Sequence, residues 1–376
     1  MVLRNLVLAI LGIAIFSGCG GSIILPQNID SVNGVQTLTE KENKPNIIEY
    51  NSEIKKWKKM YKNNWHIAIL EWSDKYNLGL PKTKKKLKQV KDIKYSGLNK
   101  QDKMEYIPEE IENLEQLKRL YLSSNNLRNI PESLGNLVNL EYLNLQENNI
   151  LIIPITIGNL TSLKVFNASY NKINKIPKSL SNLFNLKELS LYANKIKYIS
   201  TSLDGLINLE SLNLGNNNIF KLPESLGNLT SLKRLSLRGT QITEIPMSFS
   251  HLIQLEYLYL NYNKIVKLGK FIENLSSLKY LDIGENNINI LPEYIGKLSN
   301  LEFLNIEGNN ITELPNSLGN LSHLKTLYLE RNKIKVVPPS LNSLTKLIIS
   351  SKNFLISYKG KNESSLQFLN RVLNIK

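Results

Sequence analysis

The chain of 376 residues carries 47 Lys and Arg against 32 Asp and Glu, and it has a single Cys. A formal net charge of +15 predicts attraction to acidic surfaces, and one cysteine excludes an internal disulfide. Between Lys41 and Lys103, 17 lysines stand against seven acidic residues. This stretch does not alternate basic residues with stacking aromatics, so no nucleic acid is expected as a partner. A solvated lysine-rich face and contact with anionic lipid or polymer both stay open.

The first 18 residues have the pattern of a secretory signal peptide. Arg4 supplies a positive charge, an apolar run extends from Leu6 to Phe16, and two small residues precede Cys19. About eleven apolar residues are too few for a spanning helix, which needs about 20. Residues 1–18 are therefore predicted to direct export and to be removed.

The residues Phe16-Ser17-Gly18-Cys19 resemble the lipobox of bacterial lipoproteins, with Phe16 in place of the usual leucine. The resemblance implies that Cys19 is lipidated and becomes the first residue of the mature chain, and several acyl chains would then hold the protein on a membrane. The predicted localisation is an exported lipoprotein, membrane-anchored in the cell envelope or at the cell surface. The alternative is an ordinary signal peptide with an incidental cysteine.

Two segments precede the repeats. Residues 19–46 are polar and aperiodic, which predicts a flexible tether. Residues 47–93 are rich in lysine and place apolar residues at helical spacing, so a helical N-terminal cap is expected there. Its tryptophans either pack over the open end of the repeats or form a stripe for a membrane or partner.

A period of 23 residues dominates residues 94–346. Within a unit the pattern is L-x-x-L-x-L-x-x-N-x-I-x-x-I-P-x-x-L-x-x-L, and the L-x-L alternation predicts a strand with its leucines inward. One irregular unit precedes ten regular ones. The regular units begin at Leu117, Leu140, Leu163, Leu186, Leu209, Leu232, Leu255, Leu278, Leu301 and Leu324.

This pattern resembles the leucine-rich repeat family at every fixed position, over about two thirds of the chain. The resemblance implies an α/β solenoid of the bacterial type. Such an arc has a parallel β-sheet on its concave face, short helical or irregular segments on its convex side and helical caps at both ends. A C-terminal cap is expected at 347–376, with a helix over 364–373.

An asparagine follows the predicted strand in nine of the ten regular units. Because an amide both donates and accepts, a buried column of them can bond the turning backbone of successive coils. Thr240 replaces it in the sixth unit, which predicts the locally weakest coil. Ser200 and Gly269 replace the proline of the I-P pair and predict a looser convex side at two places. The ladder comprises Asn125, Asn148, Asn171, Asn194, Asn217, Asn263, Asn286, Asn309 and Asn332.

The outward strand positions of the seventh to tenth units are rich in aromatic residues, beside two arginines of the sixth. Tyr and Arg often anchor protein interfaces, although Tyr also suits strands by itself. The fifth unit instead presents small polar residues. The predicted partner-binding residues are Tyr257, Tyr259, Tyr262, Tyr280, Phe303, Tyr328, Arg234 and Arg238.

Acidic residues gather in the same region. Glu307 and Glu330 occupy equivalent positions of neighbouring units, with Asp282 and Glu285 nearby. Carboxylates about 5 Å apart occur in some glycosidases, but an open sheet offers neither a pocket nor unequal environments for the two groups. We expect a solvated or partner-facing acidic patch, with calcium contact as the alternative.

The leading hypothesis is a protein-binding lipoprotein that presents its concave face to a host or envelope protein. The alternative is a structural envelope component that holds anionic polymer or lipid through the lysine-rich segment 82–91. His66, His251 and His323 are too dispersed to form a metal site. No catalytic residue, cofactor, metal or small-molecule substrate is predicted, so the chain is expected not to be an enzyme.

Overall fold

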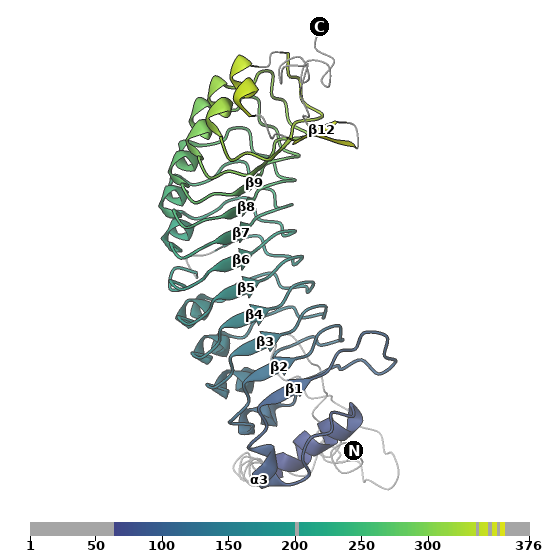
Figure 1. Cartoon of the computed structure of the whole chain (residues 1–376). Coiled ribbons are helices and arrows are strands. Elements are labelled where there is room, and N and C mark those ends of the chain that lie inside the picture. Colours follow the sequence, from purple (N-terminus) through teal and green to yellow (C-terminus); the bar gives the residue numbers. More distant parts are fainter. Residues whose placement is uncertain (1–63, 200–202, 336–337, 345–347, 352–353, 358–376) are drawn as a thin grey trace, which may run out of the picture. The chain divides into compact units, whose positions relative to one another are not determined.

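A computed structural model describes residues 64–199, 203–335, 338–344, 348–351 and 354–357 (Figure 1). The signal peptide, Cys19 and the tether lie outside the described residues, as do Ser200 and the helix expected over 364–373. The described residues belong to one compact unit that begins at Asn64. Among them, no helix combines the length and apolar character needed to cross a membrane.

The N-terminal end of this unit is helical and packs on the first coils. A helix over 64–75 buries Trp65 and Trp72, and the indole Nε1 of Trp72 donates a hydrogen bond to the Tyr106 carbonyl oxygen at 3.1 Å. A second, short helix follows, α3 (Lys84–Leu87), which buries Leu87. These two tryptophans therefore belong to the core and do not form an exposed stripe.

Within the described residues, thirteen strands form a single sheet in chain order (Figure 1). Neighbours from β1 to β12 pair in parallel, and only β13 runs antiparallel to its neighbour. The strands are β1 (Asp92–Lys94), β2 (Arg119–Tyr121), β3 (Tyr142–Asn144), β4 (Val165–Asn167), β5 (Glu188–Ser190), β6 (Ser211–Asn213), β7 (Arg234–Ser236), β8 (Tyr257–Tyr259), β9 (Tyr280–Asp282), β10 (Phe303–Asn305), β11 (Thr326–Tyr328), β12 (Ile348–Ser351) and β13 (Phe354–Ser357).

The sheet extends beyond the repeat bounds expected from the sequence at both ends. Strand β1 begins at Asp92, inside the segment assigned to the helical cap, and pairs with Arg119 of β2. The segment assigned to the C-terminal cap opens with the strand pair β12–β13. A three-residue strand is hard to recognise in the sequence where the leucines no longer recur. The predicted ends of the repeat segment, residues 94 and 346, therefore fall short of the ends of the sheet.

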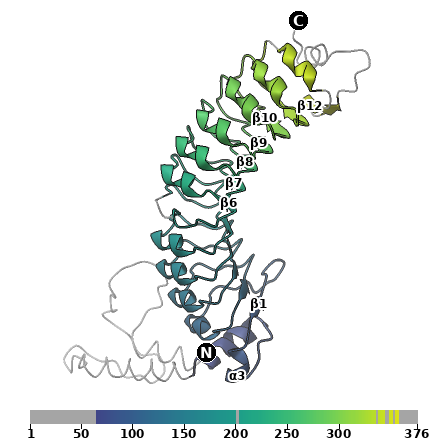
Figure 2. The ribbon, with the colours of Figure 1, turned by 60° about the vertical axis from the view of Figure 1, so that its left-hand side comes forward.

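Short 3₁₀ helices line the side away from the sheet (Figures 1 and 2). Each is preceded by an extended residue, which is a proline in every case but η7. The fixed φ of proline suits this entry and prevents a longer helix. They are η1 (Glu109–Asn113), η2 (Glu132–Asn136), η3 (Ile155–Asn159), η4 (Lys178–Asn182), η5 (Glu224–Asn228), η6 (Met247–His251), η7 (Lys270–Asn274), η8 (Glu293–Lys297), η9 (Asn316–Asn320) and η10 (Pro339–Ser343).

Gly269, expected to loosen the convex side, holds the same extended conformation as the prolines, with φ −71° and ψ 162°. Helix η7 follows it with the usual length. A Cβ at Gly269 would lie 3.0 Å from a ring carbon of Phe271, and that ring is buried edge-on against Phe249. Gly269 thus makes room for a large core side chain, and the expected loosening is not found there.

The asparagine ladder joins neighbouring coils as expected. The amide nitrogen of Asn148 donates to the carbonyl oxygens of Leu122, at 2.9 Å, and Leu145, at 3.0 Å. Its Oδ1 accepts from the Leu127 amide at 3.0 Å. One side chain therefore satisfies backbone groups of two coils, which water cannot reach.

Thr240 makes a different set of contacts. Its hydroxyl lies 3.0 Å from the Leu237 carbonyl oxygen and 2.6 Å from Oδ1 of Asn263. An Asn at this place would donate to the Leu214 carbonyl oxygen and accept from the Ile219 amide, as the other ladder residues do. The described residues show neither of these two inter-coil bonds at Thr240. The weaker sixth coil stays a prediction.

The residue before each ladder position adopts a left-handed conformation. Ten residues spaced by 23 have φ between 50° and 66°. Only two of them are glycine, so eight coils place a side chain where the backbone is strained. These residues are Ser124, Glu147, Tyr170, Ala193, Asn216, Gly239, Tyr262, Glu285, Gly308 and Arg331.

Every residue of the incoming edge, which we define as the residue immediately before each of strands β2–β11, is a lysine or a glutamate. Glu141 bridges Lys118 and Lys164 at 2.9 and 2.7 Å. Glu210 bridges Lys187 and Lys233 at 2.9 and 2.8 Å. Lys279 and Lys325 pair with Glu256 and Glu302, so all six lysines of this edge are neutralised by a neighbouring coil.

Candidate binding surface on the sheet

The aromatic residues predicted to bind a partner form one continuous cluster on the exposed face of the sheet. Register places Tyr257, Tyr280 and Phe303 side by side on β8, β9 and β10. The rings of Tyr280 and Phe303 stack in parallel with centroids 4.1 Å apart. Tyr259 lies 4.9 Å from Tyr280, and Tyr328 lies 5.3 Å from Phe303. We call these five residues the aromatic cluster.

The two predicted arginines cover the β7 side of the cluster. The Arg234 guanidinium lies over the Tyr257 ring at 4.9 Å, and that of Arg238 lies over the Tyr262 ring at 4.7 Å. Tyr262 is 52% exposed and is one of the left-handed residues. Sequence reasoning therefore named eight residues that the structure brings together on or directly after β7–β11.

Mutual stacking leaves the cluster half-buried, and this burial alters its chemistry. Burial raises the pKa of Tyr280 to about 12 and also raises that of Tyr259. A tyrosine is already neutral near pH 7 at its ordinary pKa, and burial keeps these two phenols in that proton-donating form to still higher pH. Half-buried rings with polar tips are suited to an interface that is partly apolar and partly hydrogen-bonded.

A buried carboxylate lies beside the aromatic rings. Asp282, at the end of β9, is 7% exposed, and its Oδ1 accepts a hydrogen bond from the Gly284 amide at 3.1 Å. Equivalent strand positions carry neutral Asn144, Asn167 and Asn305, which accept the same turn bond. Burial raises the pKa of Asp282. An anion stands here where other coils make the same turn with an uncharged amide.

Asn261, between β8 and its ladder residue, is a site residue that the sequence did not indicate. It is 4% exposed, and its Oδ1 has no hydrogen-bond partner among the described residues. Two residues after Tyr259, it borders the aromatic cluster. A buried acceptor without a partner costs free energy, and the repeat pattern does not indicate which outward-facing positions will be buried.

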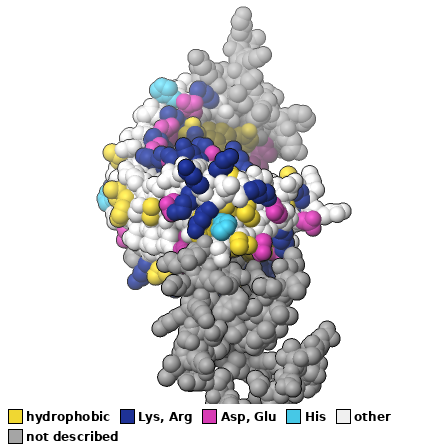
Figure 3. Space-filling view, turned by 90° about the horizontal axis from the view of Figure 1, so that it is seen from below, with side chains coloured by type: hydrophobic (Ala, Val, Ile, Leu, Met, Phe, Trp, Pro, Cys, Tyr) yellow, Lys and Arg dark blue, Asp and Glu magenta, His cyan; other side chains and the backbone are white. Residues whose placement is uncertain are grey.

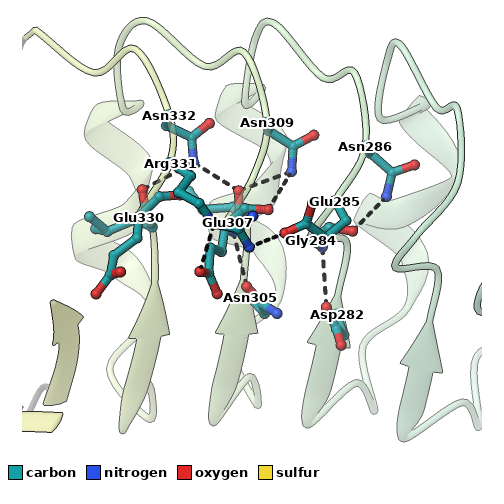
Figure 4. Close-up of polar contacts among 12 residues, drawn as sticks. Asp282, Gly284, Glu285, Asn286, Asn305, Glu307, Asn309, Glu330, Arg331 and Asn332 are labelled. Carbon is teal, nitrogen blue, oxygen red and sulfur yellow. Dashed lines mark hydrogen bonds and ion pairs between the residues drawn. The ribbon is translucent and has the colours of Figure 1, made fainter. Parts of the chain in front are cut away.

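The acidic residues near the cluster converge on an arginine that sequence reasoning missed. In Figure 4, Glu285 and Glu307 both point to Arg331. The Arg331 guanidinium pairs with Glu285, and its Nε donates to Glu307 at 3.1 Å. The hydrogen bond that Arg331 donates to Glu307 raises the pKa of Arg331. Glu285, Glu307 and Arg331 form a salt-bridge network that spans three coils.

The three histidines lie apart from one another in the described part of the chain. No group of three or more His, Cys, Asp or Glu there is arranged to hold a metal ion. His66 lies in the N-terminal helix and His251 ends η6. His323 contacts the Ser299 carbonyl oxygen through Nδ1 at 2.9 Å, a coil-to-coil bond.

The lysine-rich segment 82–91 lies at the N-terminal end, where Figure 3 shows Lys and Arg side chains gathered. Lys84, Lys85 and Lys86 of α3 are exposed. Lys82 pairs with Asp74, and Lys88 pairs with Glu115 at 2.6 Å. The segment is thus partly tied to the solenoid and partly presented to solvent.

Comparison with known families supplies the assignment that the geometry suggests. A family model described as leucine-rich repeat region matches residues 69–200, 194–285 and 266–355. The chain belongs to the leucine-rich repeat family. The three matches together cover the helical end, the repeats and β12, so the irregular first coil is part of this repeat array. A comparison with curated proteins found no significant match.

Solved structures of this family resemble the chain to different extents. An internalin (inlF) from Listeria monocytogenes is 28% identical with a TM-score of 0.59, over 71% of this chain and 82% of that one. A TDR receptor is 30% identical with a TM-score of 0.59, over 64% of this chain. The TLR13–ssRNA13 complex is 26% identical with a TM-score of 0.57, over 66% of this chain. The match spans 44% and 38% of these two chains, and the internalin indicates a repeat protein of bacterial type.

Proposed function

We propose that this chain is an exported lipoprotein, anchored through Cys19, that binds a protein partner with the sheet face of β7–β11. The partner is a protein of the cell envelope or of a host. The face is expected to be the concave one. The repeat array acts as a binding scaffold and not as an enzyme.

The aromatic cluster is the observation that carries this proposal. Five rings with arginines at one side concentrate the residue types that most often anchor interfaces. The rings are already ordered by stacking before a partner arrives, so binding costs less conformational entropy. Carboxylates at Asp282 and Glu285 oppose a nucleic-acid ligand, whose phosphates would be repelled.

Asp282 supports a binding role because its charge is not needed for the fold. The turn that it makes is also made by Asn305 on the next strand. A buried anion retained at a cost, beside exposed rings and Arg238, suits recognition of a positively charged or hydrogen-bond-donating group of the partner.

The proposal is tested by charge reversal of Arg234 and Arg238 together, Arg234→Glu and Arg238→Glu. Both side chains are exposed, so the fold should survive, as a thermal melt would show. Proteins captured from envelope or host extracts by the wild type should be lost from this variant. The matched control is Lys264→Glu with Lys267→Glu, the same charge change on the coil edge. Identical capture by all three proteins would contradict the proposal.

Asp282→Asn gives a second, independent test. It should weaken binding of the captured partner while raising the melting temperature at pH 7, since the neutral amide satisfies the same turn. Asn305→Asp, the converse change on β10, should lower stability without improving binding. Unchanged affinity in Asp282→Asn would remove this residue from the site.

Anchoring is tested separately through Cys19→Ala in the native host. The variant should move from the membrane fraction to the soluble fraction, because the thiol is the acyl acceptor. Retention in the membrane fraction would contradict lipidation at Cys19.

A second candidate function uses the lysines of α3, which are exposed at the N-terminal end (Figure 3). They would hold anionic envelope polymer or lipid and make the protein a structural envelope component. This binding should weaken strongly with salt and should survive Arg234→Glu with Arg238→Glu. Lys84→Glu with Lys86→Glu should abolish it.

A further inference from the structure

A second charged edge of the solenoid differs from the incoming one. We define the outgoing edge as the segment that leads from each ladder asparagine to the next 3₁₀ helix. Backbone bonds stack these segments coil on coil, for example from the Lys172 amide to the Ile150 carbonyl at 2.9 Å and from Lys195 to Ile173 at 2.8 Å. Side chains of successive units therefore form one continuous surface.

Units three to five of this edge carry positive charge, and unit two beside them is uncharged. Their segments, up to the residue before the 3₁₀ helix, are 149–154, 172–177, 195–199 and 218–223, and they contain no Asp or Glu. The first residue of the following helix is Ile155 in unit two, Lys178 in unit three and Glu224 in unit five. All six lysines are exposed, and the described residues show no ion pair to any of them. Every lysine of the incoming edge is paired, so the contrast lies within the same four coils. The six are Lys172, Lys175, Lys178, Lys195, Lys197 and Lys221.

Large apolar side chains beside these lysines face solvent, in unit two next to the lysines of unit three and within units four and five. Leu151, Ile152 and Ile155 of unit two are 47%, 64% and 69% exposed. Tyr198 of unit four and Phe220 of unit five are 75% and 54% exposed. The core is complete without them, so their exposure is a property of the surface and not a defect of packing.

We propose that this outgoing edge of units two to five docks on an anionic lipid membrane. Lysines near an anionic surface each strengthen binding about fivefold, and their long stems let the ammonium groups remain at the headgroups. Isoleucine, leucine and phenylalanine enter the acyl boundary, and Tyr198 suits the interface. A nucleic acid would use the lysines but leave three aliphatic side chains in water.

The edge has definite limits along the array. Unit one has one basic residue, Arg128, no exposed large apolar side chain in its segment, and Glu132 at the start of η2. Unit six carries Glu244 and no lysine. Unit seven again has Lys264 and Lys267, with Val266 between them exposed by 45%, and unit eight exposes Ile290 by 62%. Unit six separates these residues from the surface, so they provide matched controls.

The test places a reporter on the surface itself. In the full chain with Cys19→Ala, an introduced cysteine is the only thiol, so Ile155→Cys and Ile290→Cys can each carry a nitrobenzoxadiazole label. Vesicles with phosphatidylserine should shift the emission of the label at 155 to the blue, and the label at 290 should not respond. Site-specific labels separate this docking from insertion of the apolar N-terminal run.

Charge reversal completes the test. Lys175→Glu with Lys197→Glu should lower the partition coefficient measured at label 155 by about 25-fold or more. Lys264→Glu with Lys267→Glu should change it less than about twofold. Thermal melts check that both variants fold.

Three outcomes would overturn the proposal. They are no shift at 155, an equal shift with pure phosphatidylcholine, or an equal shift with duplex DNA in place of vesicles. The last would assign the surface to nucleic acid. Because these variants leave β7–β11 untouched, failure here is independent of the protein-binding proposal.

Discussion

Strands β6 and β9 have the same framework and different surfaces. Their inward residues, Leu212 and Leu281, are both buried. The ladder residue Asn217 donates to two carbonyls at 2.9 Å, and Asn286 makes the same two bonds at 3.0 Å. Outward, β6 presents Ser211 where β9 presents Tyr280. The inward column thus sets the fold of every coil, and the outward positions are free to specify what each half contacts.

The largest expected effect tests whether the framework is really the same in both halves. Asn217→Ala and Asn286→Ala should each lower the free energy of unfolding by about 3 kcal/mol, because buried carbonyls and an amide lose their partner. Urea unfolding of the full chain measures this. A much larger loss for Asn286→Ala would mean that the ladder does not contribute equally to the stability of the two halves.

Substitutions at outward positions should affect stability differently in the two halves. Tyr280→Ala should cost about 2 kcal/mol, since the ring contacts those of Tyr257, Tyr259 and Phe303. Ser211→Ala at the register-equivalent place on β6 should stay within about 0.5 kcal/mol. The same unfolding experiment compares them. Equal effects would show that the aromatic cluster adds nothing to the fold.

Thr240 lies where the two halves meet. Thr240→Asn should stabilise the chain by about 1 kcal/mol through new bonds with the Leu214 carbonyl and the Ile219 amide. Thr240→Ser, which keeps the hydroxyl, should bring no gain. Hydrogen exchange of the Ile219 amide should slow in the Asn variant alone, and unchanged exchange would contradict the weaker sixth coil.

The smallest effect concerns the incoming edge. Two lysines hydrogen-bonded to Glu210 lower its pKa to about 2, below the ordinary value of 4.5. The folded pKa is depressed, so the stabilisation is present above about pH 4.5 and is lost as pH falls through about 2. Glu210→Gln should lower the melting temperature slightly at pH 7 and hardly at pH 2. Glu302→Gln, which loses only Lys325, should have a smaller effect; the reverse order would contradict this account.

The repeat pattern predicted the solenoid, its parallel sheet and the asparagine ladder, because each depends on residues that recur at a fixed spacing. It also placed the eight surface residues on neighbouring strands. The ends of the sheet were missed because β1, β12 and β13 lie outside the regular period. Where the leucines stop recurring, the period cannot be used to place a strand.

The remaining differences involve contacts between coils that no single unit encodes. Arg331 pairs with Glu285 two coils away. Gly269 was predicted to loosen the convex side, but it makes room for the Phe271 ring. Asn261 is buried, whereas Arg238 at the equivalent place of the preceding unit is exposed. Such facts depend on side-chain direction, which a repeat pattern leaves undetermined.

The constant step of 23 residues between β2 and β11 has a consequence for the length of the array. Because each coil meets the next through the same bonds, removal of one whole unit between β4 and β6 would let the flanking coils rejoin. The aromatic cluster would then move one strand spacing, about 4.8 Å, toward the N-terminal end with its own geometry intact. The number of repeats therefore works as a ruler, which sets the reach of the binding face independently of what that face recognises.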